Sequence, residues 1–148
     1  MARNPRRNLP DGTYHVTTRA VGGERAFRDD EDRRLFLSLL ARAARRHAWR
    51  LDTFCLMTTH YHLLLACTRE DLSDGFRFLN GDYARAFNER YGRRGHLFAG
   101  RFASQLVESE EHVDAARRYI LLNPVKAGLC RAAAEWPWSR SRYGRDLA

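Results

Sequence analysis

Two histidines separated by a single residue, His60 and His62, form the feature of this sequence with the clearest chemical meaning. They open an apolar run over 60–67 that predicts a β-strand. On a strand, side chains two residues apart point to the same face, so both imidazoles project together while Tyr61 and Leu63 face the core. Two adjacent neutral imidazoles are a natural start to a divalent-metal site. The alternative is that both histidines only occupy a half-solvated strand face.

A second pair, Tyr119 and Asn123, is spaced four residues apart near the end of a predicted helix. Residues with this spacing lie one above the other on the same helix face. A tyrosine can act as a covalent nucleophile, and a bound cation assists it by polarising the phosphoryl oxygen of the group under attack. The alternative interpretation places the Tyr119 ring in the core with its hydroxyl at the surface, and makes Asn123 a helix C-cap.

The elements that must position these residues alternate between strands and helices. We predict strands over 13–21, 49–57, 60–67 and 102–107, and helices over 29–47, 71–91 and 109–123. The two middle strands are joined by only two residues and should therefore pair as a hairpin. The order β-α-β-β-α-β-α predicts an α/β (α+β) fold in which the helices pack mainly on one face of an antiparallel sheet.

Residue types mark the ends of two helices. The acids at 29–32 precede an apolar stripe with helical spacing and suit the positive end of a helix dipole, so we interpret them as a helix start rather than a metal site. Ser109 is a good N-cap for the last helix, because its hydroxyl can accept a hydrogen bond from the first turn. Pro124 is predicted to end that helix.

Charge points to a polyanionic partner, since 26 Lys and Arg outnumber 18 Asp and Glu and leave a net charge of +8. Every basic residue except Lys126 is an arginine, whose planar group pairs with phosphates and stacks on bases. Many gather at the chain ends and around a Gly-rich loop: Arg3, Arg6, Arg7, Arg90, Arg93, Arg94, Arg101, Arg140, Arg142 and Arg145. Tyr91, Phe98 and Trp138 lie among them and could stack on unpaired bases. An arginine bias also arises in GC-rich genomes, so charge alone leaves nucleic-acid binding open.

Length and composition predict one domain over 1–148. No segment approaches the roughly 20 apolar residues of a membrane span, and the N-terminus has no apolar signal core, so we expect a cytoplasmic protein with no membrane partner. Cys55, Cys67 and Cys130 are widely spaced and form no CxxC pair. We therefore expect neither a disulfide framework nor a zinc ribbon.

Together these motifs resemble the single-tyrosine HUH transposases, and most closely the REP-associated tyrosine transposases of bacteria. The resemblance covers nearly the whole chain and consists of short blocks in one order. The blocks are Tyr14-His15-Val16-Thr17 with Arg19, Phe27-Arg28-Asp29-Asp30-Glu31-Asp32 with Arg33, Cys55-Leu56-Met57 leading into His60-x-His62, Tyr91-Gly92, Gly95-His96-Leu97-Phe98, Gly100-Arg101-Phe102, Arg118-Tyr119-Ile120, Asn123-Pro124-Val125, Ala127-Gly128-Leu129 and Trp136-Pro137-Trp138-Ser139.

The resemblance implies a ferredoxin-like sandwich and an enzyme that cleaves and rejoins single-stranded DNA, at hairpin (REP-like) sequences, through a 5′-phosphotyrosine. Within it, His60, His62 and Asn123 match the ligands of one Mg²⁺ or Mn²⁺, and Tyr119 matches the nucleophile. The residues expected to contact DNA around this site are His15, Arg19, Arg93, Arg94 and Arg101. The implied partner is single-stranded or hairpin DNA, the implied location is the cytoplasm near the nucleoid, and both a monomer and a homodimer remain open.

Three positions depart from the family pattern. Tyr61 replaces a small aliphatic residue, Thr58-Thr59 replaces Pro-Asn, and Leu121 replaces a common histidine. We expect the first two to change packing rather than metal ligation, while the third puts turnover in question. A domesticated, non-catalytic DNA hairpin-binding protein is therefore one alternative function. A small-molecule metallohydrolase is another, disfavoured because such enzymes usually need a carboxylate and only Asp114 is close to either motif.

Overall fold

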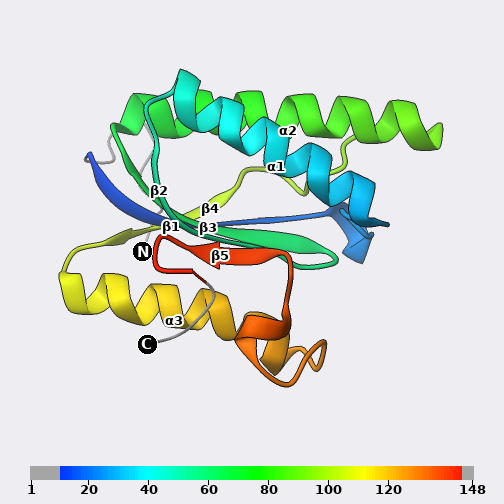
Figure 1. Ribbon diagram of the computed structural model, residues 1–148. Coiled ribbons are helices and arrows are strands. Elements are labelled where there is room, and N and C mark those ends of the chain that lie inside the picture. The colour runs from blue at the N-terminus through cyan, green and yellow to red at the C-terminus, as the bar shows by residue number, and fades with distance from the viewer. Residues whose placement is uncertain (1–10, 145–148) are drawn as a thin grey trace.

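The computed structural model describes residues 11–144, which form a five-stranded sheet with helices on both faces (Figure 1). The strands are β1 (Gly12–Arg19), β2 (Arg50–Leu56), β3 (His60–Cys67), β4 (Ala103–Val107) and β5 (Ser139–Ser141). The helices are α1 (Asp30–Arg46), α2 (Arg69–Tyr91) and α3 (Glu110–Lys126), with short 3-10 turns at Val21–Gly23 and Ala133–Glu135. The arginines singled out at positions 3, 6, 7 and 145 lie outside the described residues.

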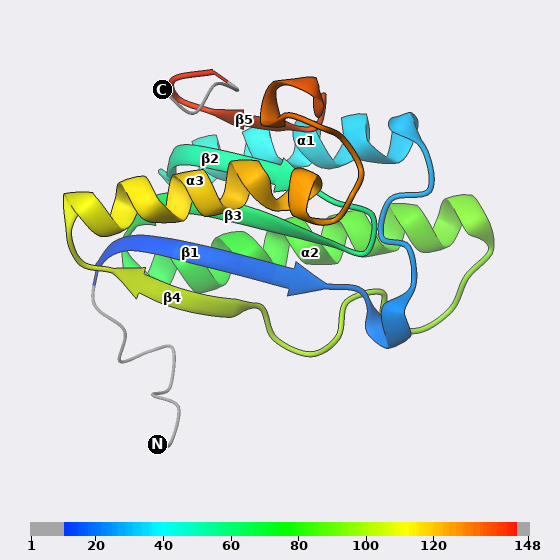
Figure 2. The same ribbon diagram turned by 90° about the horizontal axis from the view of Figure 1, so that it is seen from below.

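The strands lie in the order β4-β1-β3-β2-β5, and every neighbouring pair is antiparallel. With α1 and α2 as the connections, the first four strands have the ferredoxin-like arrangement that was expected. β1 and β3 run side by side through the middle of the sheet (Figure 2). Their register pairs Arg19 with His60 and Thr17 with His62. The histidine pair therefore lies on a central strand, where neighbours on both sides fix its position.

The two faces of the sheet carry different helices. α1 and α2 lie together on one face, whereas α3 lies on the opposite face (Figure 1). Tyr14 and Tyr61 belong to the large core beneath α1 and α2, while Leu64 packs with Ile120 of α3 in a smaller cluster. The prediction that helices pack mainly on one face holds for α1 and α2. The exception, α3, is the helix that carries Tyr119.

Capping side chains set the starts of α1 and α3 as predicted. The Asp29 carboxylate accepts a hydrogen bond from the backbone N–H of Asp32 at 3.0 Å, and the Ser109 hydroxyl accepts one from His112 at 3.1 Å. Each bond satisfies an amide of the first turn, which has no partner within its helix.

The predicted end of α3 at Pro124 is wrong, because the helix continues to Lys126 and is capped by Ala127. A proline removes one backbone donor, the one that would bond to the carbonyl of Ile120. Here that loss falls in the last turn, where the Ala127 N–H still donates to the Asn123 carbonyl at 2.9 Å. The helix therefore tolerates the proline and extends far enough to include Lys126.

The strand β5 is missing from the predicted elements. Its three residues, Ser139–Ser141, pair with residues 53–55 of β2 at the edge of the sheet. A three-residue Ser-Arg-Ser segment is too short for an alternating apolar pattern, so only the long-range pairing identifies it. Among residues 11–144, no helix has an apolar stretch long enough to cross a membrane.

Candidate active site

Three histidines and a tyrosine from three elements meet on the α3 face of the sheet. His15 comes from β1, His60 and His62 from β3, and Tyr119 from α3. The ring centroid of His62 lies 5.2 Å from that of His15, 5.1 Å from that of His60 and 6.0 Å from that of Tyr119. The His15 and Tyr119 centroids are 5.8 Å apart. The fold thus brings the predicted nucleophile to the predicted metal-binding histidines, and places His15 inside the same cluster.

His62 is at the centre of this cluster and is only 3% exposed. Its Nδ1 lies 3.0 Å from Nε2 of His15 and 3.1 Å from Oγ1 of Thr17. Its Nε2 is buried and makes no hydrogen bond within the described part of the chain. Leaving a buried polar atom without a partner is costly. The described residues provide no such partner for Nε2 of His62.

His60 has a similar environment at the start of the same strand. The Thr59 hydroxyl oxygen lies 3.1 Å from Nδ1 of His60. Burial, and then the positive charge of Arg19, lower the pKa of His60 to about 4. Burial and the neighbouring imidazoles lower the pKa of His62 to about 3. Both rings are therefore neutral near pH 7, and each keeps a lone pair that a cation can use.

These features fit the start of a divalent-cation site. The two imidazoles are adjacent and neutral, a neighbour holds Nδ1 of each ring, and His62 has an unpaired Nε2. Metal-bound histidines usually have this arrangement, in which a hydrogen bond to one ring nitrogen orients the other toward the cation. Within residues 11–144, no group of three or more His, Cys, Asp or Glu side chains is placed to hold a metal. A cation bound here would therefore need an amide, water or substrate oxygen as well.

Asn123, the predicted third ligand, lies inside α3 one turn beyond Tyr119. Its Nδ2 donates a hydrogen bond to the Tyr119 backbone carbonyl at 3.2 Å. Since Ala127 caps the helix, the alternative in which Asn123 is the C-cap is wrong. Ligation by Asn123 stays a prediction.

Tyr119 is not a core residue, because 47% of it is exposed. Tyr119 is therefore accessible from solvent while its ring lies in T-shaped arrangements with His15 and His62. Nζ of Lys126, the only lysine in the chain, lies 5.1 Å from the centroid of the Tyr119 ring. The positive charge of Lys126 therefore lies close to the Tyr119 ring.

The three departures from the family pattern leave this cluster intact. Tyr61 points to the opposite face, where its hydroxyl donates to Oδ1 of Asn80 at 2.6 Å. Leu121 is fully buried. Thr59 supplies the hydroxyl that contacts His60. Tyr61 and Leu121 therefore belong to the packing, whereas Thr59, which was expected to change packing, contacts a histidine of the cluster.

Three of the arginines expected to contact DNA are exposed around one end of β1: Arg19, Arg94 and Arg101. Backbone pairing brings the loop that carries the latter two to this place, since the Ala99 N–H donates to the Arg19 carbonyl at 2.8 Å. Arg19 is also the register partner of His60. A strand of DNA that reached the histidine cluster would therefore meet basic side chains at this end of the sheet.

Arg93 has a different environment. Its guanidinium group forms a two-pronged ion pair with Glu24 and also donates to the carbonyls of Gly95 at 3.2 Å and His96 at 2.9 Å. Only 15% of its side chain is exposed. These contacts fix the Gly-rich loop and use the donors of Arg93 inside the protein, which argues against the DNA contact predicted for it.

The aromatic residues among the arginines also have internal roles. Phe98 is buried, so the prediction that it stacks on bases is wrong. Tyr91 donates its hydroxyl to Asp32 at 2.7 Å, and both Tyr91 and Trp138 pack against the large core.

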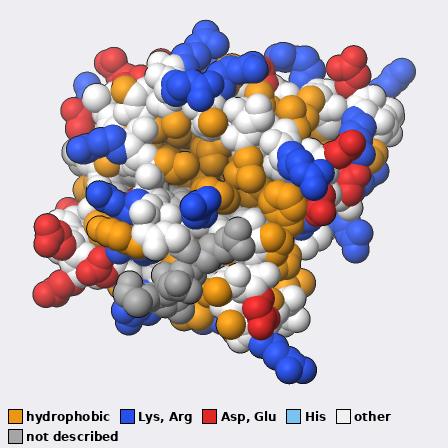
Figure 3. Space-filling view, in the orientation of Figure 1, with side chains coloured by type: hydrophobic (Ala, Val, Ile, Leu, Met, Phe, Trp, Pro, Cys, Tyr) orange, Lys and Arg blue, Asp and Glu red, His pale blue; other side chains and the backbone are white. Residues whose placement is uncertain are grey.

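Basic side chains do not gather into one patch on the face shown in Figure 3, where Lys and Arg are spread out and acidic side chains accompany them at the edges. Several arginines are also paired, as Arg90 is with Asp29 and Asp32, both at 2.6 Å. The number of basic residues therefore overstates how many are free to bind DNA.

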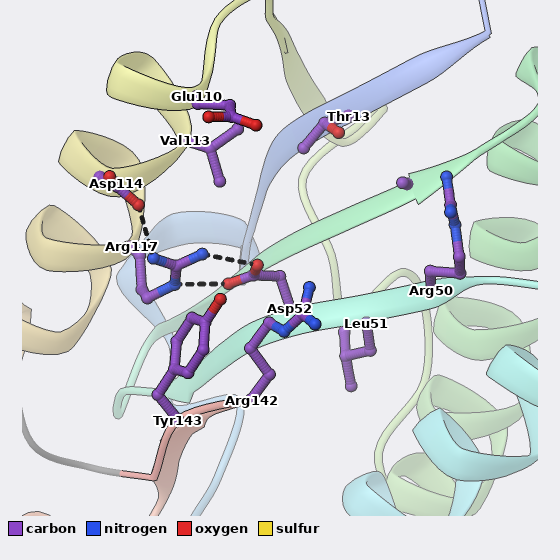
Figure 4. Close-up of a pocket in the computed structure, with 11 residues that line it drawn as sticks. Thr13, Arg50, Leu51, Asp52, Glu110, Val113, Asp114, Arg117, Arg142 and Tyr143 are labelled. Carbon is purple, nitrogen blue, oxygen red and sulfur yellow. Dashed lines mark hydrogen bonds and ion pairs between the residues drawn. The ribbon is translucent and has the colours of Figure 1, made fainter.

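A cavity of about 510 Å³ lies away from the histidine cluster, between β2, the start of α3 and the C-terminal segment (Figure 4). Its central feature is Arg117, whose guanidinium group donates to both oxygens of Asp52 at 2.8 Å and to Asp114 at 2.8 Å. Arg117 also lies over the Tyr143 ring. Since Arg117 of α3 is paired with Asp52 of β2, we interpret the network as the anchor of α3 on the sheet. Sequence reasoning misses it, because Asp52 and Arg117 are 65 residues apart.

Comparisons with known proteins identify the family and the fold of this chain. Residues 9–123 match the family described as "Transposase IS200 like". Among solved structures, a REP-associated tyrosine transposase bound to a REP hairpin is similar, with a TM-score of 0.79 and 17% identity over 94% of this chain and 82% of that one. A candidate transposase from Deinococcus radiodurans R1 is similar with a TM-score of 0.54 and 21% identity, over 80% of this chain and 95% of that one. At these identities the two structures support the fold alone. No curated protein matches the chain.

Proposed function

The chain belongs to the IS200-like transposase family, and from this premise we propose that it cleaves and rejoins single-stranded DNA with Tyr119 as the nucleophile. The observation that carries this proposal is the contact of Tyr119 with His62, whose ring in turn lies beside that of His60. An exposed tyrosine thus lies against a neutral imidazole that has a buried, unpaired ring nitrogen and a second neutral imidazole beside it. A cluster that served folding alone would need neither an exposed tyrosine nor a buried imidazole nitrogen without a partner.

The reaction is a transfer between two phosphate esters. The phenol oxygen of Tyr119 loses its proton and attacks the phosphorus of the scissile phosphodiester. The bond from phosphorus to the 3′ oxygen breaks, and that oxygen leaves as a 3′-hydroxyl after taking up a proton. The protein then holds the downstream strand as a 5′-phosphotyrosine. Attack by a 3′-hydroxyl on this ester reverses the step, so rejoining needs no ATP.

The residues that would hold the cation are His60, His62 and Asn123. When bound, Mg²⁺ or Mn²⁺ polarises a phosphoryl oxygen and offsets negative charge as the phenol attacks. Since all three side chains are neutral, we expect such a hard cation to bind weakly until DNA supplies phosphate oxygens. Lys126 lies over the Tyr119 ring and adds the positive charge that this ligand set lacks.

The proposed substrate is a DNA hairpin with an unpaired flank. This is the class of DNA to which the similar solved structure, a REP-associated tyrosine transposase, is bound. The exposed residues Arg19, Arg94 and Arg101 provide contacts for phosphates at the His60 end of the sheet. Binding through such contacts should weaken steeply as salt rises. We place the protein with DNA in the cytoplasm.

The test uses hairpin oligonucleotides with unpaired flanks, taken from the DNA around the protein's own gene, labelled at the 3′ or the 5′ end. With Mn²⁺, the 3′ label should migrate with the protein on a denaturing gel, while the 5′ label should appear on a shorter free strand. EDTA should prevent both products. Binding of the hairpin with no covalent product at any Mn²⁺ concentration would instead indicate the non-catalytic hairpin-binding protein.

A further inference from the structure

His15 and the two threonines beside the histidine pair have contacts that the proposed reaction does not use directly. His15 Nε2 and Thr17 Oγ1 both approach Nδ1 of His62, at 3.0 and 3.1 Å. Thr59 Oγ1 approaches Nδ1 of His60 at 3.1 Å. The same ring nitrogen is thus held in both histidines, by side chains from two different parts of the chain.

The chemistry of imidazole gives this repetition a meaning. A neutral ring has one protonated nitrogen, which donates, and one bare nitrogen, which accepts or binds a cation. If Nδ1 of His62 carries the proton, it can donate to Nε2 of His15 or to the Thr17 oxygen, and the buried Nε2 is left bare. If Nε2 carried the proton instead, a buried donor would have no acceptor and could not bind a cation, whereas a bare Nε2 gains its partner when a cation binds.

We infer that His15 and Thr17 are positioning residues that hold His62 with its proton on Nδ1 and its Nε2 free for the cation, and that Thr59 does the same for His60. This inference rests on the proposed function, and it replaces the DNA contact that the sequence suggested for His15. His15 can accept the hydrogen bond from His62 at Nε2 only if its own proton is on Nδ1. The hydrogen bond between the two rings therefore runs from His62 to His15.

The first test reads the tautomers directly and needs neither metal nor DNA. In a ¹⁵N-labelled, metal-free protein, the ¹⁵N shifts and two-bond couplings of the imidazoles distinguish Nδ1–H from Nε2–H rings. We expect the Nδ1–H form for His15, His60 and His62. An Nε2–H form at His62 would overturn the inference even if the protein cleaves DNA.

The second test separates positioning from DNA contact. In the Tyr119→Phe background, which blocks cleavage, Mn²⁺ affinity is measured on the hairpin complex by electron paramagnetic resonance, and hairpin affinity is measured in EDTA. His15→Leu should weaken Mn²⁺ binding about 10- to 100-fold and leave hairpin affinity in EDTA within about twofold. His15→Gln should restore part of the Mn²⁺ affinity, because its carbonyl oxygen can accept the same hydrogen bond.

Matched variants complete this test. Thr17→Val and Thr59→Val should each weaken Mn²⁺ binding, whereas Thr13→Val, on the same strand and the same face but away from the cluster, should not. Loss of hairpin affinity in EDTA with unchanged Mn²⁺ affinity in His15→Leu would show a DNA contact and overturn the inference. Unchanged Mn²⁺ affinity in all three variants would also overturn it. If the wild-type protein forms no covalent product, the proposed function fails separately from the tautomer result.

Discussion

The aromatic side chains on the two faces of the sheet have different environments, although buried polar atoms without a partner among the described residues also occur on the α1 and α2 side, in Thr18, Arg33 and His47. Beneath α1 and α2, the polar tips of buried aromatic residues are satisfied within the protein: Tyr61 donates to Asn80 at 2.6 Å and Tyr83 donates to the Ala26 carbonyl at 2.5 Å. Beneath α3, His62 is held on one side of its ring and left without a partner on the other. Tyr119 on that face is half exposed.

This difference shows how one small domain separates stability from chemistry. On the α1 and α2 face, aromatic rings such as Phe36 and Tyr61 pack against each other, with centroids 4.6 Å apart, so substitutions there should act on folding. On the α3 face, we expect the unpaired nitrogen and the exposed phenol to add little to folding, and they are the groups proposed to meet the cation and the phosphate. Substitutions there should act on the reaction.

The largest effect is expected from removing either histidine of the pair. His60→Ala or His62→Ala should lower metal-dependent cleavage by at least about 100-fold, because each removes a proposed ligand rather than a group that orients one. Hairpin affinity in EDTA should stay close to that of the wild-type protein. His96→Ala, which removes an exposed histidine of the Gly-rich loop, is the control and should cleave normally. Full activity of both variants at saturating EDTA would exclude the metal role.

Substitutions of Asn123, on the same face, should have smaller effects but distinguish metal ligation from a role in the helix alone. Asn123→Ala should raise the Mn²⁺ concentration needed for half-maximal cleavage, since it removes an amide oxygen from the proposed ligand set. Asn123→Asp keeps an oxygen and adds a charge, so it should bind Mn²⁺ at least as well as the wild-type residue. Titrating Mn²⁺ against cleavage rate for the three proteins gives the answer. Identical titration curves would show that Asn123 serves only its helix, through its bond to the Tyr119 carbonyl.

Much of this division between faces could be predicted from the sequence, because it depends on local spacing. The strand that begins at His60, the shared face of His60 and His62, and the caps at Asp29 and Ser109 all follow from residues close together in the chain. What the sequence could not provide depends on distant pairings. These are β5 at the edge of β2, the placement of α3 on the face opposite α1 and α2, and the position of His15 against His62.

A substitution in the core beneath α1 and α2 should lower stability and leave the reaction unchanged. Tyr61→Phe keeps the buried ring but leaves the Asn80 oxygen without its donor, so the free energy of unfolding should fall by about 1–2 kcal/mol. The rate of cleavage per folded molecule should not change. Urea unfolding and cleavage assays on the same preparations measure both. A slower reaction with unchanged stability would place Tyr61 in the site and contradict the division.

The smallest effect concerns acid stability in the α1 and α2 layer. Hydrogen bonds from Arg90 and from the Asp32 amide hold the pKa of Asp29 at about 2, below its ordinary value of 3.8. Because the folded pKa is lowered, the stabilisation is fully present above about pH 4 and is lost as the pH falls toward 2. Asp29→Asn should therefore lower the thermal midpoint at pH 7, and its difference from the wild-type protein should shrink between pH 4 and 2. A difference that stays constant over this range would assign the effect to helix capping alone.

The central claim is that Tyr119 becomes covalently joined to DNA, and mass spectrometry of the adduct tests it most directly. Trypsin cuts after Arg118 and Lys126 and releases a peptide, 119–126, in which Tyr119 is the only tyrosine. After reaction with a hairpin and Mn²⁺ and digestion of the DNA, this peptide should carry the nucleotide through a 5′-phosphate. The Tyr119→Phe protein should bind the hairpin and yield no modified peptide, and Tyr143→Phe, at the other exposed tyrosine, should react normally. A nucleotide on a peptide that contains Tyr14, Tyr61, Tyr83, Tyr91 or Tyr143 would contradict the account.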